Sequence, residues 1–378
     1  MIIEVSGVGF QNMGAALMLA AAAETVSAWP NVERVVASLK TGSRTQRASV
    51  GCASVLRLDA ERRLWADRVV ESGSRAIPTR ALERLSLYKP ERVDALLDAS
   101  GYALGDQWGA RPARRKAQLF KRYANEGKPV VLLPQALGPF DDVEVRDATT
   151  SALENVDLVF ARDMESLAHF RELGLSGVRI ESGPDFTNLT VPPAIEPADS
   201  TVVVIPNGRM DEMAGSASGL AYSAFLRDFV DAVLRRGFGV VVIAHEPMDQ
   251  RYAERLLTEF GQSVAIEADT DPIRTKALVG GASLVVSSRY HGLVNALSQC
   301  VPAIGTSWSH KYEQLFADYG CDDSLWDVGD PIAVSMKLDS WLERRSLTIR
   351  RKELQEPAET IKADARAMWR KVKAAVSA

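Results

Sequence analysis

An arginine and a histidine, Arg289 and His291, stand two positions apart in the stretch of this sequence best suited to chemistry. They follow an apolar run over residues 282–286, which predicts a buried parallel strand, and they precede apolar residues with helical spacing over 293–300. Open α/β sheets bind ligands at the carboxyl ends of their strands. A helix that begins there adds free backbone N–H groups and a positive dipole end. This edge is therefore suited to a phosphorylated or carboxylated ligand.

Other charged residues are predicted to lie at the same edge of this sheet. Arg209 follows the predicted strand 201–205, and His245 and Asp249 follow the next strand along the chain. Taken alone, His245 is more often a packing or capping residue, and Asp249 is suited to cap the helix behind it. Their recurrence after successive strands favours a shared site. Lys311, which opens a helix after a later strand, points either into that site or into solvent.

The first half of the chain also places small and polar residues after its predicted strands. A glycine-rich loop that ends at Gly14 is either a tight turn or an anion cradle, and its spacing lacks the dinucleotide-binding pattern. Asn12 within it either binds a ligand or caps the following helix. Ser100 and Gly101 allow a ligand to approach the backbone, and Gln135 is a polar candidate for ligand binding.

Three charged residues complete the candidates of the first half. Arg162 stands at a strand's carboxyl end, where a guanidinium can hold a carboxylate or phosphate through two hydrogen bonds. Asp163 follows it and either caps the next helix or joins the site. Asp185 is either a turn residue or a carboxylate of the site.

Strand-like runs alternate with helical patterns along the chain, which predicts parallel sheets with crossover helices. Three prolines between residues 192 and 197 cannot continue a helix or a central strand and predict a linker. The expected fold is α/β, with two Rossmann-like domains facing a cleft, over residues 1–190 and 198–345. Residues 350–378 predict an amphipathic C-terminal helix. Irregular helices are expected in the polar, arginine-rich segment 41–90.

The composition argues against several classes of protein. A net charge of −4 gives no reason to expect nucleic-acid binding. Three widely spaced cysteines fit a reducing compartment better than a disulfide framework. The strand-like N-terminus predicts no signal peptide, and no apolar run approaches the roughly 20 residues that span a bilayer. A cytoplasmic protein is therefore expected.

The stretch Ser288-Arg289-Tyr290-His291-Gly292, with the later Asn295-Ala296 and Val301-Pro302, resembles the signature of the polysaccharide pyruvyl transferase family. Arg162-Asp163 with Ser166, Pro184-Asp185 and Lys311 are similar to its other recurrent positions, in the same order. The resemblance covers about residues 5–320. Two departures concern the acceptor side: Ala15 replaces the aspartate of an Asn-x-Gly-Asp loop, and Ser100 replaces the first glycine of a Gly-Gly pair.

This resemblance implies transfer of a pyruvyl group from phosphoenolpyruvate to the hydroxyls of a polysaccharide or its precursor. The product is a cyclic ketal, phosphate leaves, and no redox cofactor is needed. The implied fold is GT-B-like, with the C-terminal helix bracing back on the first domain. The implied partners are phosphoenolpyruvate and a sugar acceptor, which is lipid-linked, nucleotide-linked or polymeric. Metal dependence and homo-oligomer formation stay open.

The resemblance also suggests roles for the candidate residues. His291 would act as general acid or assist the departing phosphate, with Arg289 beside it, and the general base would be Asp185 or Asp163. Cationic and imidazole groups would bind the donor: Arg162, Arg289, Lys311, Arg209 and His245. Small and polar groups would bind the acceptor: Asn12, Gly14, Ser100, Gly101 and Gln135.

Three other functions compete with this interpretation: a GT-B-type nucleotide-sugar glycosyltransferase, a two-lobed binding protein and a nicotinamide enzyme. The glycosyltransferase is the nearest, because it shares the architecture and also requires loops that bind phosphate. The basic C-terminal segment has two interpretations as well. It either braces the first domain or contacts the inner face of a membrane that carries a lipid-linked acceptor.

Overall fold

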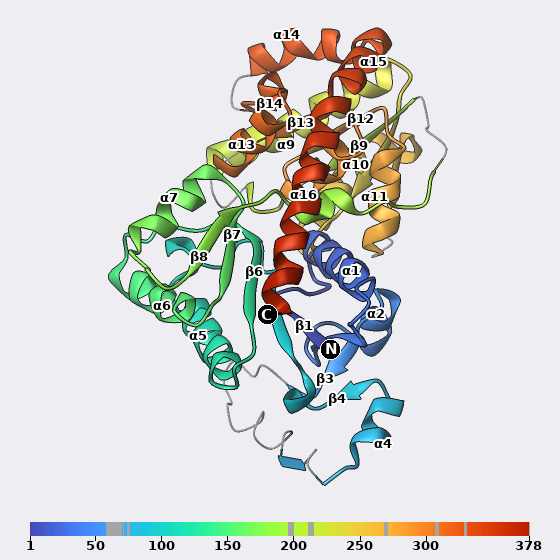
Figure 1. The fold of residues 1–378 in the computed structure, drawn as a ribbon. Helices are drawn as coiled ribbons and strands as arrows, with labels where there is room; N and C mark the ends of the chain where they lie inside the picture. Colours follow the sequence, from blue (N-terminus) through green and yellow to red (C-terminus); the bar gives the residue numbers. More distant parts are fainter. Residues whose placement is uncertain are drawn as a thin grey trace. The chain divides into compact units, whose positions relative to one another are not determined.

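The computed structural model describes residues 1–57, 70, 72–73, 76–195, 200–210, 215–267, 271–306, 310–328 and 331–377. The chain forms two compact units, which are labelled by element in Figure 1. Unit 1 consists of Met1–Phe10, Ala15–Phe186 and Asp364–Ala378, and unit 2 of Gln11–Gly14 and Thr187–Ala363. Each unit contains one parallel sheet, so the predicted two-domain α/β fold is confirmed.

The sheet of unit 1 has eight strands in the order β4-β3-β2-β1-β5-β6-β7-β8, all paired in parallel. The strands are β1 (Ile2–Ser6), β2 (Arg34–Ser38), β3 (Ala53–Val55), β4 (Leu87–Tyr88), β5 (Ala95–Asp98), β6 (Val130–Gln135), β7 (Leu158–Ala161) and β8 (Arg179–Ser182). The central strands are buried along their whole length, because helices cover both faces of the sheet.

The helices of unit 1 follow the predicted alternation closely. They are α1 (Met13–Ser27, which begins in the segment assigned to unit 2), α2 (Arg44–Ser49), α4 (Thr79–Arg84), α5 (Ala110–Asn125), α6 (Val143–Leu153) and α7 (Met164–Glu172). The expectation for segment 41–90 was incomplete, since it includes the short strands β3 and β4 as well as helices. Strands of two or three residues are too short for a period-two pattern to show. Part of that segment, 58–69, 71 and 74–75, lies outside the described residues.

The sheet of unit 2 has six parallel strands in the order β11-β10-β9-β12-β13-β14. The strands are β9 (Thr201–Ile205), β10 (Gly239–Ile243), β11 (Val264–Glu267), β12 (Leu284–Ser287), β13 (Ala303–Thr306) and β14 (Leu325–Trp326). The helices are α9 (Gly215–Arg235), α10 (Gln250–Phe260), α11 (Pro272–Gly280), α12 (Tyr290–Leu297), α13 (His310–Asp318), α14 (Pro331–Trp341), α15 (Arg344–Glu353) and α16 (Gln355–Val376).

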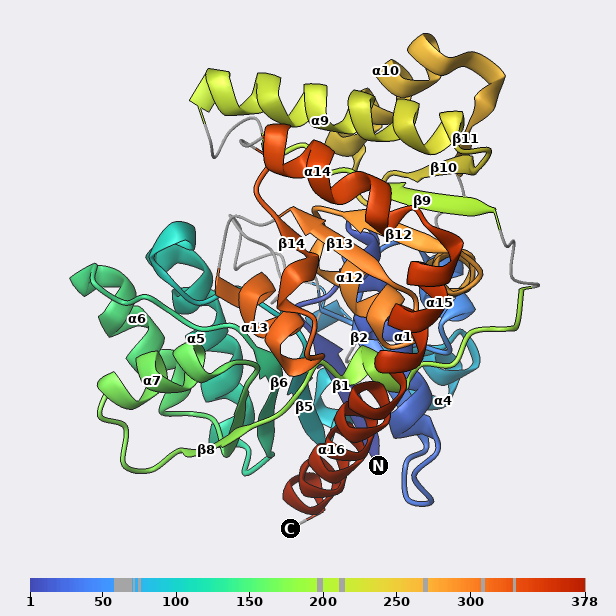
Figure 2. The same ribbon diagram turned by 90° about the horizontal axis from the view of Figure 1, so that it is seen from above.

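Strand β9 shows why an unbroken apolar run forms the centre of this sheet. Its residues point alternately to opposite faces. Val202 and Val204 pack with α9, α10, α14 and α15, whereas Val203 and Ile205 pack with α11, α12 and α13. Figure 2 shows α9 and α14 on one side of this sheet and α12 and α13 on the other. Both faces are buried, so a run without polar alternation is stable there.

The strand order reverses at one place in each sheet. In unit 1 the reversal lies between β1 and β5, and in unit 2 it lies between β9 and β12. The chain leaves neighbouring strands in opposite directions at such a point and opens a crevice outside their carboxyl ends. Asp98 and Ser100 stand at the reversal of unit 1, and Asn207 and Arg289 stand at that of unit 2.

Helix α16 starts in unit 2, and its last part belongs to unit 1. Trp369 packs edge-to-face on Trp29 and Phe186, with centroid distances of 6.0 and 5.5 Å. Lys371 forms an ion pair with Glu181. The predicted return of this helix to the first domain is therefore confirmed. No helix of the described part of the chain is long and apolar enough to span a membrane.

Candidate active site

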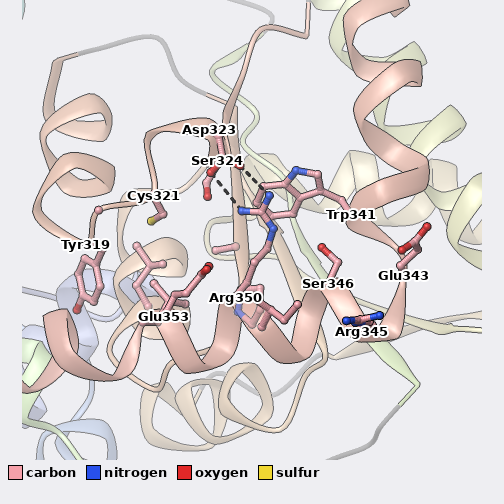
Figure 3. Close-up of a pocket in the computed structure, with 16 residues that line it drawn as sticks. Tyr319, Cys321, Asp323, Ser324, Trp341, Glu343, Arg345, Ser346, Arg350 and Glu353 are labelled. Carbon is pink, nitrogen blue, oxygen red and sulfur yellow. Dashed lines mark hydrogen bonds and ion pairs between the residues drawn. The ribbon is translucent and has the colours of Figure 1, made fainter.

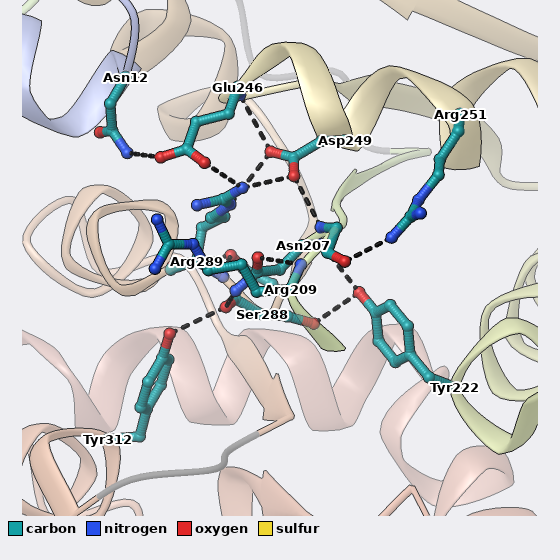
Figure 4. Close-up of polar contacts among 12 residues, drawn as sticks. Asn12, Asn207, Arg209, Tyr222, Glu246, Asp249, Arg251, Ser288, Arg289 and Tyr312 are labelled. Carbon is teal, nitrogen blue, oxygen red and sulfur yellow. Dashed lines mark hydrogen bonds and ion pairs between the residues drawn. The ribbon is translucent and has the colours of Figure 1, made fainter. Parts of the chain in front are cut away.

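Arg289 occupies the reversal point of unit 2, where β12 ends and α12 begins. Its Nε and Nη2 lie 3.0 and 2.5 Å from the two carboxylate oxygens of Asp249, and Nη2 also lies 2.8 Å from Oε2 of Glu246 (Figure 4). Burial disfavours the charge on Arg289, but the bonds to both carboxylates outweigh it and raise the pKa of the guanidinium. The arginine is therefore a fixed cation between two anions.

Asp249 forms hydrogen bonds to residues that follow three different strands. It is wholly buried, and it also accepts hydrogen bonds from the backbone N–H groups of Gly208 (2.7 Å) and Glu246 (3.0 Å). Gly208 follows β9, Glu246 follows β10 and Arg289 follows β12. Asp249 does precede α10, but its side chain makes no capping bond to that helix. Its carboxylate orders the edge of the sheet instead.

The segment Gln11–Gly14 belongs to unit 2, which places Asn12 and Gly14 beside residues predicted for the donor. The Asn12 amide donates to Oε1 of Glu246, and the Met13 N–H donates to the carbonyl of His245 (3.1 Å). A Cβ added to Gly14 would lie 2.3 Å from Nδ1 of His291. The close approach of the histidine ring therefore requires glycine at position 14.

The two histidines of the cluster differ in exposure. His245 is buried, and His291 is partly exposed, with its ring 5.6 Å from that of Tyr290 in an edge-to-face arrangement. Burial, together with the charges of Arg289 and His291, lowers the pKa of His245 to about 3. His245 is therefore neutral near pH 7 and offers an anion a hydrogen bond rather than a charge. Its Nε2 has no hydrogen-bond partner among the described residues.

We expect the free energy of unfolding to fall by about 2 kcal/mol more between about pH 7 and pH 5 in the wild-type protein than in His245→Gln. In the unfolded chain the histidine pKa returns to 6.5, and in the folded protein it is about 3. Between these values the unfolded state binds the extra proton, so stability present above pH 6.5 is lost as the pH falls. Urea unfolding at several pH values measures this difference. An equal change of the free energy of unfolding with pH in the two proteins would contradict this expectation.

Further polar contacts brace the ends of β9 and β12 (Figure 4). The carbonyl of Ser288 accepts from the Asn207 amide (3.0 Å) and the Tyr312 hydroxyl (2.9 Å), and the Ser288 hydroxyl lies 2.7 Å from that of Tyr222. Nothing in the sequence pattern pointed to these tyrosines, because aromatic residues at helical spacing ordinarily indicate a core.

Two further cations predicted for the donor also belong to unit 2. Lys311 is half-buried, with Nζ 5.5 Å from the ring centroid of Tyr312 and 5.9 Å from that of Tyr290. Arg209 is half-buried after β9, and its backbone N–H donates to Oδ1 of Asn207 (3.0 Å). Unit 2 therefore contains Arg289, His291, His245, Arg209 and Lys311, together with Asn12 and Gly14.

A second polar cluster lies at the reversal point of unit 1. The buried carboxylate of Asp98 accepts from Lys116 (2.6 Å), the Gln135 amide (2.7 Å) and the Ser6 hydroxyl (3.1 Å). Burial raises the pKa of Asp98, but the charge of Lys116 and these bonds outweigh it and lower the pKa. Lys116 also donates to the hydroxyl of Ser100. Gln135 and Ser100, predicted for the acceptor, thus make contacts within the protein.

The remaining candidates of unit 1 lie at the ends of β7 and β8. Arg162 and Asp185 are buried, with Nη1 and Oδ2 3.6 Å apart. Asp163 accepts from the Ser166 N–H (2.7 Å) and so caps α7, as one of its two interpretations predicted. Gly101 has a left-handed backbone (φ 70°), and a Cβ there would lie 3.9 Å from Nη1 of Arg162.

The sequence analysis did not identify three charged residues of these two clusters. Glu246, between the candidates His245 and Asp249, was given no role, and Asp98 and Lys116 were not selected. Asp98 does carry a signal, because it ends an otherwise apolar strand at a carboxyl edge. Lys116 carries none, since it lies in a helix rich in basic residues. Among the described residues, no three His, Cys, Asp or Glu side chains gather closely enough to hold a metal ion.

A cavity of about 640 Å³ lies at the opposite edge of the unit 2 sheet, near the start of β13 (Figure 3). One arginine of its wall is already paired: the Arg350 guanidinium lies 3.6 Å from the ring centroid of Trp341 and 2.7 Å from a carboxylate oxygen of Asp323. Burial raises the pKa of Cys321 in its wall to about 11, so this thiol is not a nucleophile near pH 7. We therefore place the candidate active site around Arg289 and His291.

Solved structures define the class of fold. S. aureus MnaA with UDP is similar at 12% identity and a TM-score of 0.58, covering 94% of this chain and 92% of that one. A putative UDP-N-acetylglucosamine 2-epimerase from Listeria monocytogenes is 13% identical with a TM-score of 0.59, covering 98% of this chain and 96% of that one. Anabaena Alr3699/HepE in complex with UDP-glucose is 12% identical with a TM-score of 0.56, covering 98% of this chain and 99% of that one. These similarities confirm the GT-B-like fold.

This chain belongs to the polysaccharide pyruvyl transferase family, whose sequence model matches residues 12–310. The match includes the Arg289–His291 motif and confirms the resemblance seen in the sequence. Among curated protein sequences, none is significantly similar to this chain.

Proposed function

We propose that this protein transfers a pyruvyl group from phosphoenolpyruvate to two hydroxyls of a sugar, forming a ketal and releasing phosphate. Family membership supports pyruvyl transfer to a polysaccharide. The observation that supports this choice of donor is that Arg209, His291 and Lys311 follow the neighbouring strands β9, β12 and β13 at the carboxyl edge of the unit 2 sheet. Phosphoenolpyruvate has a phosphate and a carboxylate, and this edge offers cations and the positive end of a helix dipole for both.

We assign the anion contacts to the side chains of Lys311 and Arg209. Arg289 has its charge balanced by Asp249 and Glu246, so we assign it to ordering the site. We assign the role of general acid to His291, because its imidazole is partly exposed and can give a proton to a bound ligand. It would donate a proton to C3 of phosphoenolpyruvate and make C2 an electrophile.

We assign the sugar acceptor to unit 1, where Ser100 and Gly101 follow β5 at the reversal point. Hydroxyl and backbone groups at such an edge suit a polyhydroxylated ligand. Arg162 and Asp185 stand at neighbouring strand ends of the same sheet. The proposed reaction moves protons and exchanges a phosphate oxygen for two sugar oxygens at C2, with no net electron transfer, so it needs no redox cofactor.

We expect phosphoenolpyruvate to raise the unfolding temperature of the protein and to release phosphate in the presence of a suitable sugar. A ligand at about 100 times its Kd stabilises the folded state by about 2.7 kcal/mol. The assay combines a panel of sugar acceptors with mass analysis for the pyruvyl product. His291→Ala should retain the thermal shift and lose turnover by about 10²–10⁴-fold. Near-wild-type kcat in this variant would remove His291 from the catalytic role.

A nucleotide-sugar enzyme is the second candidate. It is favoured by the fold shared with proteins solved with UDP and UDP-glucose. The same thermal assay separates the two functions. Stabilisation by UDP alone, with release of UDP from a UDP-sugar and no consumption of phosphoenolpyruvate, would replace pyruvyl transfer with this second function.

A further inference from the structure

The carboxylate of Glu246 is oriented by three contacts. Oε1 accepts from the Asn12 amide, Oε2 lies 2.8 Å from Nη2 of Arg289, and the side chain also accepts from the backbone N–H of Asp249. The backbone N–H of Glu246 is bound in turn by Asp249 (3.0 Å), so the loop that carries it is also held. Figure 4 shows Glu246 between Asn12 and Arg289. A side chain with both oxygens directed in this way is pre-organised rather than freely rotating.

Glu246 also keeps access to solvent. The side chain of Glu246 is 18% exposed, whereas that of Asp249, the other carboxylate on Arg289, is 0% exposed. Asp249 accepts four hydrogen bonds from the surrounding loops and Arg289, so it has no oxygen to offer a ligand. Of the two acids bound to Arg289, Glu246 is therefore the one that can meet a substrate.

Glu246 and His291 lie against the same four-residue segment of unit 2. Asn12 binds Glu246, and two residues later Gly14 leaves room for the His291 ring. Arg289, which holds Glu246, is separated from His291 by a single residue. An acid–base pair for addition across a double bond requires two such groups at one site, one giving a proton and one taking it.

We propose that Glu246 is the general base of the pyruvyl transfer, an inference that rests on the proposed function. As His291 donates a proton to C3, a sugar oxygen bonds to C2 and its proton passes to Glu246. The bond from C2 to the phosphate oxygen then breaks, and the phosphate leaves with the electron pair. The second hydroxyl bonds to C2 and its proton ends on phosphate. The proton on Glu246 returns to His291 through solvent, which closes the cycle.

The sequence suggested Asp185 or Asp163 as the general base. The surroundings of these two aspartates make them less suitable for that role than Glu246. Asp163 caps α7, and Asp185 is buried 3.6 Å from Arg162. Both aspartates are buried, with 5% of Asp163 and 3% of Asp185 exposed, whereas the side chain of Glu246 is 18% exposed. Glu246 belongs to the same unit as His291.

The test is the steady-state kinetics of Glu246→Gln with phosphoenolpyruvate and the sugar that the acceptor panel identifies. We expect kcat to fall about 10²–10⁴-fold, while KM for phosphoenolpyruvate changes less than about tenfold. If Glu246 is the base, the fall of kcat at low pH seen in the wild-type protein should be absent from the residual kcat of Glu246→Gln. Glu246→Asp, which keeps a carboxylate, should recover part of the lost kcat. Glu259→Gln, on the exposed side of α10, is the matched control and should retain wild-type rates.

The outcomes separate this inference from the proposed function. If the wild-type protein consumes no phosphoenolpyruvate with any acceptor, pyruvyl transfer itself is overturned. If the wild-type protein is active and Glu246→Gln keeps the kcat and pH profile of Glu259→Gln, Glu246 is not the base. Loss of kcat in Asp163→Asn with retention in Glu246→Gln would move the role to Asp163. Thermal unfolding of each variant shows whether it is folded before its kinetics are compared.

Discussion

Replacing Arg289 with methionine is expected to lower the free energy of unfolding by about 3–5 kcal/mol. The substitution leaves Asp249, whose side chain has no exposure, as a buried charge without its cation. Methionine keeps much of the side-chain volume, so the loss reflects the charge more than a cavity. Urea unfolding followed by circular dichroism measures the change, and pyruvyl transfer should be lost with it.

An exposed ion pair provides the control for this effect. Arg235 and Asp231 pair on the surface of α9, with side chains that are 70% and 44% exposed. Arg235→Met should change the free energy of unfolding by no more than about 0.5 kcal/mol, because solvent screens such pairs.

The double variant Arg289→Met/Asp249→Asn isolates the uncompensated charge. Removing both charges should recover a large part of the loss, since the buried carboxylate is then gone. Two results would count against the explanation: equal destabilisation by Arg289→Met and Arg235→Met, or a double variant that is less stable than Arg289→Met.

Gly14→Ala is expected to lower kcat by about 10²-fold while the protein stays folded. The new Cβ would lie 2.3 Å from Nδ1 and 2.9 Å from Cβ of His291, so the imidazole must move away from its position. Position 14 is the second residue of α1, where alanine is a better helix former than glycine. The kinetic loss should therefore come without a matching loss of helical content, which circular dichroism can verify.

Gly9→Ala is the matched control for this substitution. A Cβ at Gly9 meets nothing within 4 Å. We expect its kcat to stay within about twofold of the wild-type value, because substitutions away from packed features have small effects. Wild-type kcat in Gly14→Ala would show that the ring position of His291 does not control the reaction.

Much of the fold followed from local pattern alone. The predicted strand 201–205 coincides with β9, because an apolar run bounded by turn residues needs little tertiary information. The very short strands β3, β4 and β14 went unrecognised. Strands of two or three residues form because a neighbouring strand offers free backbone groups, and no local pattern records that neighbour.

The sequence by itself determined that Arg289 and His291 stand where a strand ends and a helix begins, since apolar periodicity on both sides defines that junction. Only the tertiary structure decided what surrounds them. The order β10-β9-β12 brings Asp249 and Glu246 to an arginine some forty residues away, where their negative charges pair with its cation. The assignment of segment Gln11–Gly14 to unit 2 brings Asn12 to Glu246 and Gly14 to His291. These contacts depend on which strands are neighbours, a non-local property that residue spacing does not encode.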